Sequence, residues 1–496
     1  MAGIGFELKK AFNKKGIIAL LKAYGYSGLV CTGPMILGIV LLLGIRMLGI
    51  MAHATRGELG LLNAMVTYTL LFSLVMVNIL AMVTTRYIAD CIYMKREEDI
   101  MPSFYGSISC VLLLGCPVWG VFLHFSGVSL SERFCCYVFF GELVLVWTEI
   151  NYLTAIKNYR EIMKAFLVAV AASLIVGYIF GVRLHILPTT MALLASMCVG
   201  YGIMGLWYYV LLTRYFPRGR CIAMKFLRWL SVYPELGCLG ICMSFGLYGH
   251  IVLMWSSPIN NCVKGLFFEA PQYDVPALLS FLSILITTIN FVTSVEVEFY
   301  PKYRNFFGLL NSEMTYSDIE QARIEMEQTL TRELSYTFLK QFFSTLLFII
   351  IGTFLIPKMP MGFNDDMLGI YNVLCCAYAF YAIGNATMLI QLYFADNSGA
   401  LISGAVFMFF SFGGTFATLF LDIKWYGFGF LLGSFLFAVV SLVQLKRFLA
   451  KILENVLSRQ PIKNEEVDGI MSRFADKCER VYRNLYRKDI LREEEE

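Results

Sequence analysis

The sequence predicts an all-α membrane protein whose twelve transmembrane helices form two bundles of six. Hydrophobic residues make up 58% of its 496 positions and charged residues only 15%, whereas a soluble domain has roughly 45–50% and about 25% respectively. The interior of a soluble fold of this length is too small to bury that much apolar surface. The excess therefore faces lipid, and the same composition excludes a disordered chain, a nucleic-acid-binding domain and a secreted disulfide scaffold.

Twelve stretches are long and apolar enough to cross a bilayer, since a transmembrane helix needs about 20 mostly apolar residues. They are residues 25–50, 61–83, 102–125, 134–156, 163–182, 189–212, 230–256, 276–299, 340–357, 367–394, 399–421 and 425–445.

The distribution of basic residues predicts which side of the membrane each connecting segment occupies. If the N-terminus is cytoplasmic, 33 of the 40 Lys and Arg residues fall on inner segments and 7 on outer loops. Membrane proteins concentrate Lys and Arg in their cytoplasmic loops. A wrong number of spans would scramble this pattern, so we expect twelve spans with both termini in the cytoplasm.

The spans and charges also predict the domain organisation. The N-terminal segment alternates apolar residues with lysines, and we expect it to lie along the inner membrane surface. Alternating charges in an insert after the eighth span predict a soluble helix. Its charged side is either a solvated face or a docking surface, and the sequence leaves both interpretations open. The charged C-terminal tail is interpreted as a solubilising helix. The five segments are an N-terminal segment (1–24), an N-terminal six-helix bundle (25–212), a basic linker (213–229), a C-terminal six-helix bundle (230–445) with its insert (301–340), and a tail (446–496).

Motifs for catalysis and metal binding are missing from the sequence. It has no GxxxxGK[ST] loop for ATP, no HExxH or GxSxG motif, and no Cys or His cluster with metal-ligand spacing. The cysteines lie mostly inside apolar runs, where a thiol acts as a small hydrophobe. We therefore expect no catalytic residue, no cofactor and no metal, although a membrane-embedded sugar-modifying enzyme with unfamiliar motifs stays open.

Acidic residues inside the spans are the main candidates for a translocation site. Glu142 and Glu149 are seven residues apart in the fourth span, two turns along one helix face, and Tyr152 follows them. Glu235 lies about one turn inside the seventh span, directly after Pro234. A charge at the bilayer centre costs at least about 2.5–3.5 kcal/mol, so such residues face a protein interior or a watery cavity. We interpret Glu142, Glu149, Glu235 and Tyr152 as cavity residues, with a cation-linked role for the first two.

Two further pairs of charged residues lie at the cytoplasmic ends of spans. Arg86 and Asp90 are four residues apart at the end of the second span, where they can neutralise each other. Glu296 and Glu298 occupy the equivalent depth on the eighth span. For both pairs the sequence favours interfacial pairing that closes an inner gate or fixes helix ends.

Prolines and glycines mark breaks in the spans. Gly33 and Pro34 interrupt the first span, Pro117 lies in the third, and Pro234 begins the seventh. Such residues persist in membrane helices where neighbours or cavity water satisfy the freed backbone groups. Discontinuous helices at matching places in two halves are the usual sequence indication of a transporter site.

Five short sequences are distinctive: MAGIGFEL at 1–8, AYGYSG at 23–28, the Gly33-Pro34 pair, TRYIAD at 85–90 and PQYDVP at 271–276. Together they resemble the PelG family of exopolysaccharide exporters. The resemblance implies the multidrug/oligosaccharidyl-lipid/polysaccharide (MOP) flippase superfamily, with two six-helix bundles around a V-shaped cavity. It also implies export of Pel-type polysaccharide across a bacterial cytoplasmic membrane for biofilm formation.

The same resemblance implies partners: a PelF-like cytosolic glycosyltransferase and PelD- and PelE-like membrane proteins. The resemblance assigns no site residue in this sequence. Two other functions stay open, namely a cation-coupled small-molecule antiporter of the multidrug and toxin extrusion (MATE) type and a non-transporting scaffold that anchors the glycosyltransferase.

Overall fold

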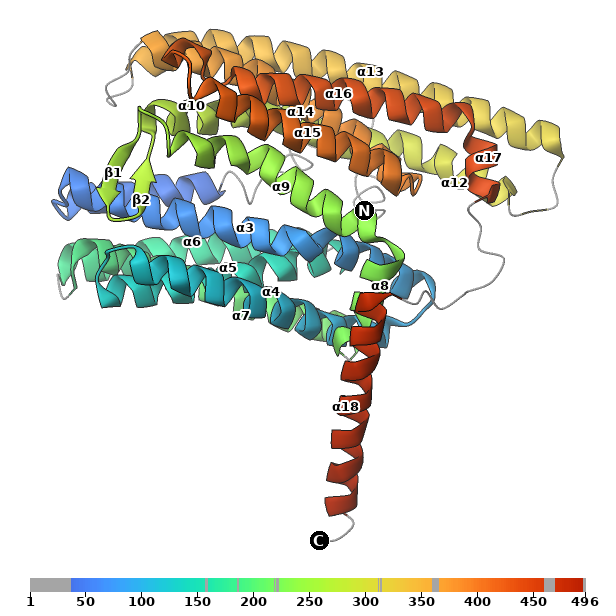
Figure 1. Ribbon diagram of the computed structural model, residues 1–496, viewed down its shortest axis with the longest axis horizontal. Coiled ribbons are helices and arrows are strands. Elements are labelled where there is room, and N and C mark those ends of the chain that lie inside the picture. The colour runs from blue at the N-terminus through green and yellow to red at the C-terminus, as the bar shows by residue number, and fades with distance from the viewer. Residues whose placement is uncertain are drawn as a thin grey trace. The chain divides into compact units, whose positions relative to one another are not determined.

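The computed structural model is almost entirely helical and contains one small hairpin of strands (Figure 1). It describes residues 37–156, 159–184, 187–217, 219, 223–310, 312, 315–358, 365–458 and 469–493. Within these residues, 11 helices are long and apolar enough to cross a membrane, and they coincide with the second to twelfth predicted spans. A shorter apolar helix, Leu37–Met51, matches the end of the first predicted span. The rest of that span lies outside the described residues, so the number twelve stays a prediction.

The first half of the chain contains seven elements after Leu37–Met51. They are α3 (Arg56–Tyr93), η1 (Glu97–Asp99), α4 (Ile100–Phe125), α5 (Leu130–Ile156), α6 (Tyr159–Gly177), η2 (Tyr178–Arg183) and α7 (Thr189–Tyr215).

The remaining elements begin with a short connector. They are η3 (Ala223–Phe226), α8 (Leu227–Val232), α9 (Pro234–Met254), β1 (Asn261–Lys264), β2 (Phe267–Glu269), α10 (Pro271–Phe281), η4 (Leu282–Ile284), α11 (Leu285–Ser294), η5 (Val295–Phe299), α12 (Tyr300–Leu310), α13 (Tyr316–Leu355), η6 (Ile356–Lys358), α14 (Asp365–Tyr393), α15 (Asn397–Thr418), η7 (Ile423–Trp425), α16 (Phe428–Ala450), α17 (Ile452–Ser458) and α18 (Ile470–Glu493).

These elements form two compact units. The N-terminal unit contains residues 37–244, the hairpin segment 262–268 and the tail helix α18; the C-terminal unit contains residues 245–261 and 269–458. The change from one unit to the other therefore falls inside α9, and the connector elements η3 and α8 belong to the N-terminal unit. The predicted basic linker is thus packed on a bundle over its described part.

Side-chain caps fix where several helices begin. Thr55 and Glu58 form a reciprocal capping box at the start of α3, in which the Glu58 carboxylate accepts the Thr55 backbone N–H at 2.8 Å. Ser129 and Glu132 do the same at the start of α5, at 2.9 Å. These two caps fix the first turns of α3 and α5, just before their apolar runs begin.

The helix α5 occupies the centre of the N-terminal unit. Its Trp147 indole N–H donates to Ser73 Oγ on α3 at 3.2 Å, and the Trp119 indole of α4 donates to the Cys136 carbonyl of α5 at 3.3 Å. Stacked rings of Phe72, Trp119 and Phe122 fill the space between α3 and α4. The apolar core of this unit is continuous from Leu41 to Phe226 and also includes Ala475 of α18.

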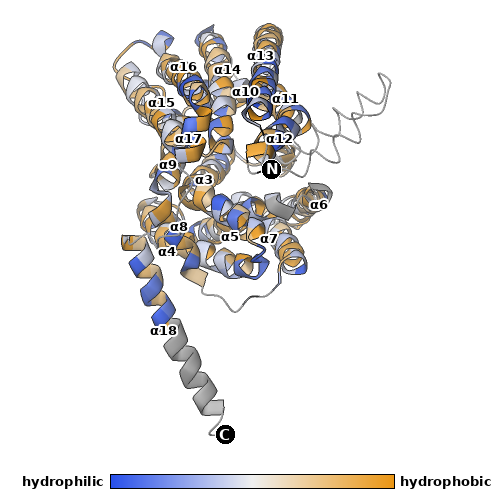
Figure 2. Cartoon of the chain, turned by 90° about the vertical axis from the view of Figure 1, so that its right-hand side faces the viewer, coloured by the Kyte–Doolittle hydropathy of each residue, from blue (hydrophilic) through white to orange (hydrophobic). Residues whose placement is uncertain are grey.

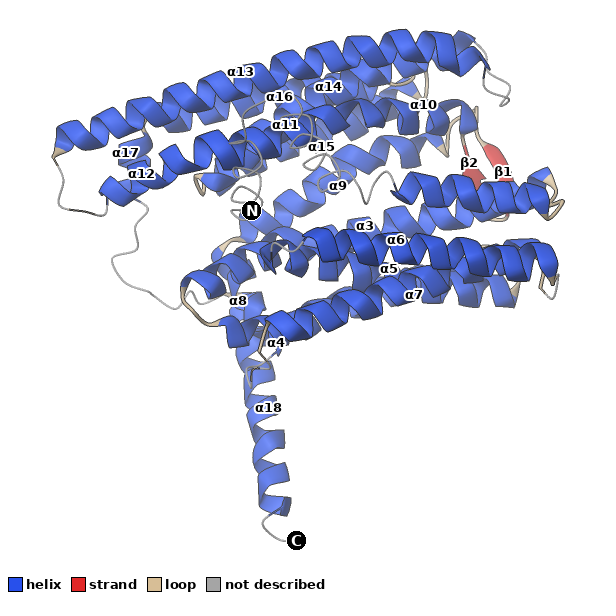
Figure 3. Ribbon diagram, turned by 180° about the vertical axis from the view of Figure 1, so that it is seen from behind, coloured by secondary structure: helices blue, strands red, loops and turns tan. Residues whose placement is uncertain are grey.

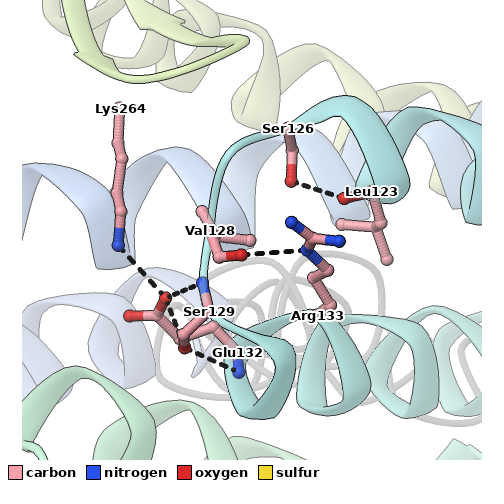
Figure 4. Close-up of polar contacts among 7 residues, drawn as sticks. All are labelled: Leu123, Ser126, Val128, Ser129, Glu132, Arg133 and Lys264. Atoms are coloured by element: carbon pink, nitrogen blue, oxygen red, sulfur yellow. Dashed lines mark hydrogen bonds and ion pairs between the residues drawn. The ribbon is translucent and has the colours of Figure 1, made fainter.

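The hairpin β1–β2 packs on the end of the N-terminal unit where α4 stops and α5 starts. Lys264 Nζ lies 3.4 Å from Glu132 Oε2, beside the α5 cap (Figure 4). Phe267 is fully buried against the rings of Tyr68 and Phe122. Gly265 has a φ of +58° and approaches the Ser126 carbonyl so closely that a Cβ would collide with it.

The helix α13 joins two predicted elements into one. Its 40 residues run from Tyr316 to Leu355, so the predicted soluble insert helix and the ninth span are continuous. No proline lies in this stretch, and its first glycine is Gly352, so nothing in the backbone ends the helix. The charged first half shares one apolar cluster with residues of α12, α14 and α16, which includes the buried side chains of Phe306, Met326, Leu330, Phe394 and Phe448.

Candidate functional site

Glu142 and Glu149 lie on the face of α5 that packs against glycines of α7. A Cβ placed on Gly202 would be 3.3 Å from Glu142 Oε1, and one on Gly205 would be 3.7 Å from Glu149 Oε2. The two glycines thus leave room for two carboxylates between the helices. The sequence predicted this shared face from the seven-residue spacing, and the contact with α7 is new.

The two carboxylates are removed from water without ionic compensation. Glu149 is fully buried, and neither of its oxygens has a hydrogen-bond partner among the described residues. Glu142 is half-buried; its Oε2 is equally unpartnered within the described part of the chain, while the Cys198 thiol lies within hydrogen-bonding reach of its carboxylate. A buried polar group without a partner costs free energy, about 1–3 kcal/mol and more for a charged group. Such groups are retained where they serve a function.

The other two cavity candidates occupy different surroundings. The Tyr152 hydroxyl is fully buried and lies 3.1 Å from Ser103 Oγ and 3.3 Å from Ser107 Oγ, which links α5 to α4. Glu235 is half-buried in the first turn of α9, where an acidic side chain complements the positive end of the helix dipole. The structure does not bring Glu235 into contact with Glu142 or Glu149 among the interactions of the described residues.

Arg86 and Asp90 form an ion pair that also holds the connector. Arg86 Nε lies 3.2 Å from Asp90 Oδ1. The Trp229 indole of α8 donates to Asp90 Oδ2 at 2.8 Å, and the Arg86 guanidinium lies 5.3 Å from the centre of the Tyr233 ring. Together with an ion pair between Lys225 and Asp99 at 2.7 Å, these contacts fasten η3 and α8 to α3 and η1. A gating role for this group stays a prediction.

The remaining predicted residues are at helix ends or outside the described chain. Pro234 is the first residue of α9, after a bend at Tyr233 that separates it from α8. Glu298 is exposed in η5, where Glu296 also lies, and no described residue forms a salt bridge with Glu298. Pro117 lies inside α4, which continues through it. Gly33, Pro34 and the whole predicted N-terminal segment 1–24 lie outside the described residues.

Sequence reasoning missed a buried polar group in the C-terminal unit. His250 of α9 is fully buried, its Nδ1 lies 2.8 Å from the Tyr273 hydroxyl, and its ring stacks on Phe430 at 4.0 Å. Beside it, Asp274 accepts the backbone N–H of Ala270 at 2.9 Å. The partners of His250 come from α10 and α16, and only the fold shows them.

The arrangement of helices identifies the class of protein. An inward-facing MATE family transporter of the MOP superfamily matches with a TM-score of 0.57 and 12% identity, covering 91% of this chain and 99% of that chain. An outward-facing MATE transporter matches at 0.53 and 13%, covering 86% and 96%. A MOP superfamily transporter from Pyrococcus furiosus also matches at 0.53 and 12%, covering 86% and 96%. The chain therefore has the fold of MATE and MOP transporters.

The family follows from a match over most of the sequence. Residues 1–456 match the PelG family, described as "Putative exopolysaccharide Exporter (EPS-E)". The chain belongs to this family. No curated protein sequence matches it.

Proposed function

We propose that this protein translocates a Pel-type exopolysaccharide across the bacterial cytoplasmic membrane. Membership of the exopolysaccharide exporter family over residues 1–456 is the observation that carries this proposal. The MATE and MOP fold supports it, because that fold belongs to transporters that cross the bilayer many times. The substrate is a polymer made on the cytoplasmic side by a PelF-like glycosyltransferase, in a complex with PelD- and PelE-like membrane partners.

The mechanism we propose is movement of the polymer through a cavity between two helix bundles. Rocking of the bundles would expose this cavity first to the cytoplasm and then to the outside. Transport of this kind breaks no bond in the substrate, so the protein acts without a catalytic residue or cofactor. The half-buried carboxylate of Glu142 and the fully buried carboxylate of Glu149 would bind a cation or proton whose arrival and departure bias the two states.

Deletion of the gene and complementation test the proposal. We expect deletion to remove extracellular polymer while the glycosyltransferase remains present and polymer is retained in the cell. If a complemented strain exports polymer even when the transporter's cavity is blocked, the chain is a scaffold. If deletion leaves extracellular polymer unchanged and instead sensitises cells to small cationic compounds, the chain is an antiporter of the MATE type.

Orientation is tested with a cysteine that the chain already has. Cys262 is exposed on β1, at the end of the N-terminal unit predicted to face outward. We expect a membrane-impermeant maleimide to label intact spheroplasts at Cys262, and the Cys262→Ser variant to lose most of that label. Cys478, on the predicted inner side, should be labelled only in inside-out vesicles, and its Cys478→Ser variant is the matched control. The reverse labelling pattern would contradict cytoplasmic termini.

A further inference from the structure

The tail helix α18 is attached to the N-terminal unit through its first turns. Its first turns pack on α8 and η3. Arg228 Nη2 lies 2.5 Å from Asp476 Oδ1 and 2.9 Å from Glu479 Oε2, and the Ser472 backbone N–H donates to Ser231 Oγ at 3.0 Å. Ala475 is buried in the core of that unit. These contacts fix one face of the helix against the connector.

The direction of α18 differs from that of every span in its unit. The spans α3 to α7 run side by side, and α18 points away from their end instead of running along them (Figures 1 and 3). A bilayer crossed by α3 to α7 has its surface perpendicular to these helices. The helix α18 therefore does not continue a span, and it starts at the end of the spans where Asp90 binds the connector, which is where the surface of such a bilayer would lie.

A second face of α18 is apolar and uncovered. Ile470, Phe474 and Val481 are four and seven residues apart, so they lie along one side of the helix. Their exposed fractions are 83%, 50% and 59%. In the described part of the helix, hydrophilic and hydrophobic residues follow one another in alternating bands (Figure 2). Three large apolar side chains in a row are costly to leave in water.

Basic residues border this apolar side. Arg473, Lys477 and Arg480 are all exposed, and residues 470–493 contain seven Lys or Arg against four Asp or Glu. An apolar strip bordered by Lys and Arg is typical of helices that lie in the membrane interface. Long basic side chains keep their stems on the apolar surface and their charges among anionic headgroups.

We propose that α18 is an interfacial helix that binds the surface of the bilayer through Ile470, Phe474 and Val481 and its anionic headgroups through the bordering basic residues. By the distribution of basic residues this is the cytoplasmic surface. Because Arg228 ties α18 to the connector between the two halves of the chain, the helix anchors that connector at the membrane surface. This role differs from the solubilising tail that the sequence suggested, and it holds whatever substrate is exported.

The full-length protein in lipid vesicles tests this proposal. An environment-sensitive fluorescent amino acid is placed at position 481 or, in a matched control, at the neighbouring position 480. With brominated lipids in vesicles that contain phosphatidylglycerol, we expect quenching at position 481 to be at least about twofold stronger than at position 480. The difference should shrink in vesicles of phosphatidylcholine alone, because the basic residues then lose their partners.

Weak and equal quenching at both positions would overturn the proposal. So would a probe at position 481 that stays in water in both kinds of vesicle and becomes shielded only when the cytosolic glycosyltransferase is added. The apolar side would then be a protein-docking surface. Because both probe positions are exposed, labelling leaves the contacts of Arg228 intact.

Discussion

Replacing Glu149 with glutamine is expected to lower extracellular polymer by about tenfold or more, within the range typical of coupling between a site and a conformational change. Glutamine has nearly the same shape as glutamate, so its side chain still fits between α5 and α7 beside Gly205. What it removes is the ability to carry or release a charge. Since Glu149 is fully buried and unpartnered among the described residues, this change costs little stability.

The companion variants make this result specific. Glu142→Gln should have a smaller effect, because Glu142 is half-buried and has the Cys198 thiol within reach. Glu454→Gln alters an exposed carboxylate paired with Lys451 at 3.6 Å, and should export normally. Polymer is measured together with co-purification of the glycosyltransferase. Normal export by Glu149→Gln with an intact complex would remove these acids from the mechanism.

Enlarging Gly429 is expected to destabilise the C-terminal unit. A Cβ on Gly429 would collide with backbone atoms of Thr415 and Gly414, where α16 crosses α15. Backbone cannot move aside as a side chain can, so Gly429→Ala should cost at least the roughly 1–3 kcal/mol of an overpacked core. We expect its thermal midpoint in detergent to fall by about 5 °C or more.

A neighbouring glycine provides the matched control for this variant. A Cβ on Gly413, which lies on α15, would meet nothing within 4 Å. Gly413→Ala should therefore leave the thermal midpoint unchanged or raise it slightly, because alanine favours a helix more than glycine does. Equal midpoints for Gly429→Ala and Gly413→Ala would contradict the close crossing of α15 and α16.

The hydropathy of the sequence was sufficient to predict the helices, but not where one helix ends and the next begins. Apolar runs of about 20 residues are set by bilayer thickness, so the second to twelfth predicted spans each coincide with a helix. The continuity of α13 was missed because a charged stretch and an apolar stretch look like separate elements, although their backbone is one helix. Likewise, α4 continues through Pro117, where the sequence predicted a break.

The site was predictable only where its residues are close in the sequence. The spacing of Glu142 and Glu149 fixes their shared face, whereas their neighbours on α7 are more than 50 residues away. The hydroxyl partners of Tyr152 lie on α4, and the charge partners of Arg228 lie on α18, 248 and 251 residues along the chain. A single sequence holds no signal for contacts of this range, which is also why the buried pair of His250 and Tyr273 was missed.

The central claim is that this chain conducts the polymer, and protection of the polymer inside inverted membrane vesicles tests it most directly. Vesicles that contain the synthase complex receive nucleotide sugars from outside and then a polymer-degrading hydrolase. We predict that polymer becomes resistant to the hydrolase when the intact chain is present, and that it stays degradable, at an unchanged rate of synthesis, when the chain carries Glu149→Gln. Equal protection in vesicles that lack the chain would contradict the claim.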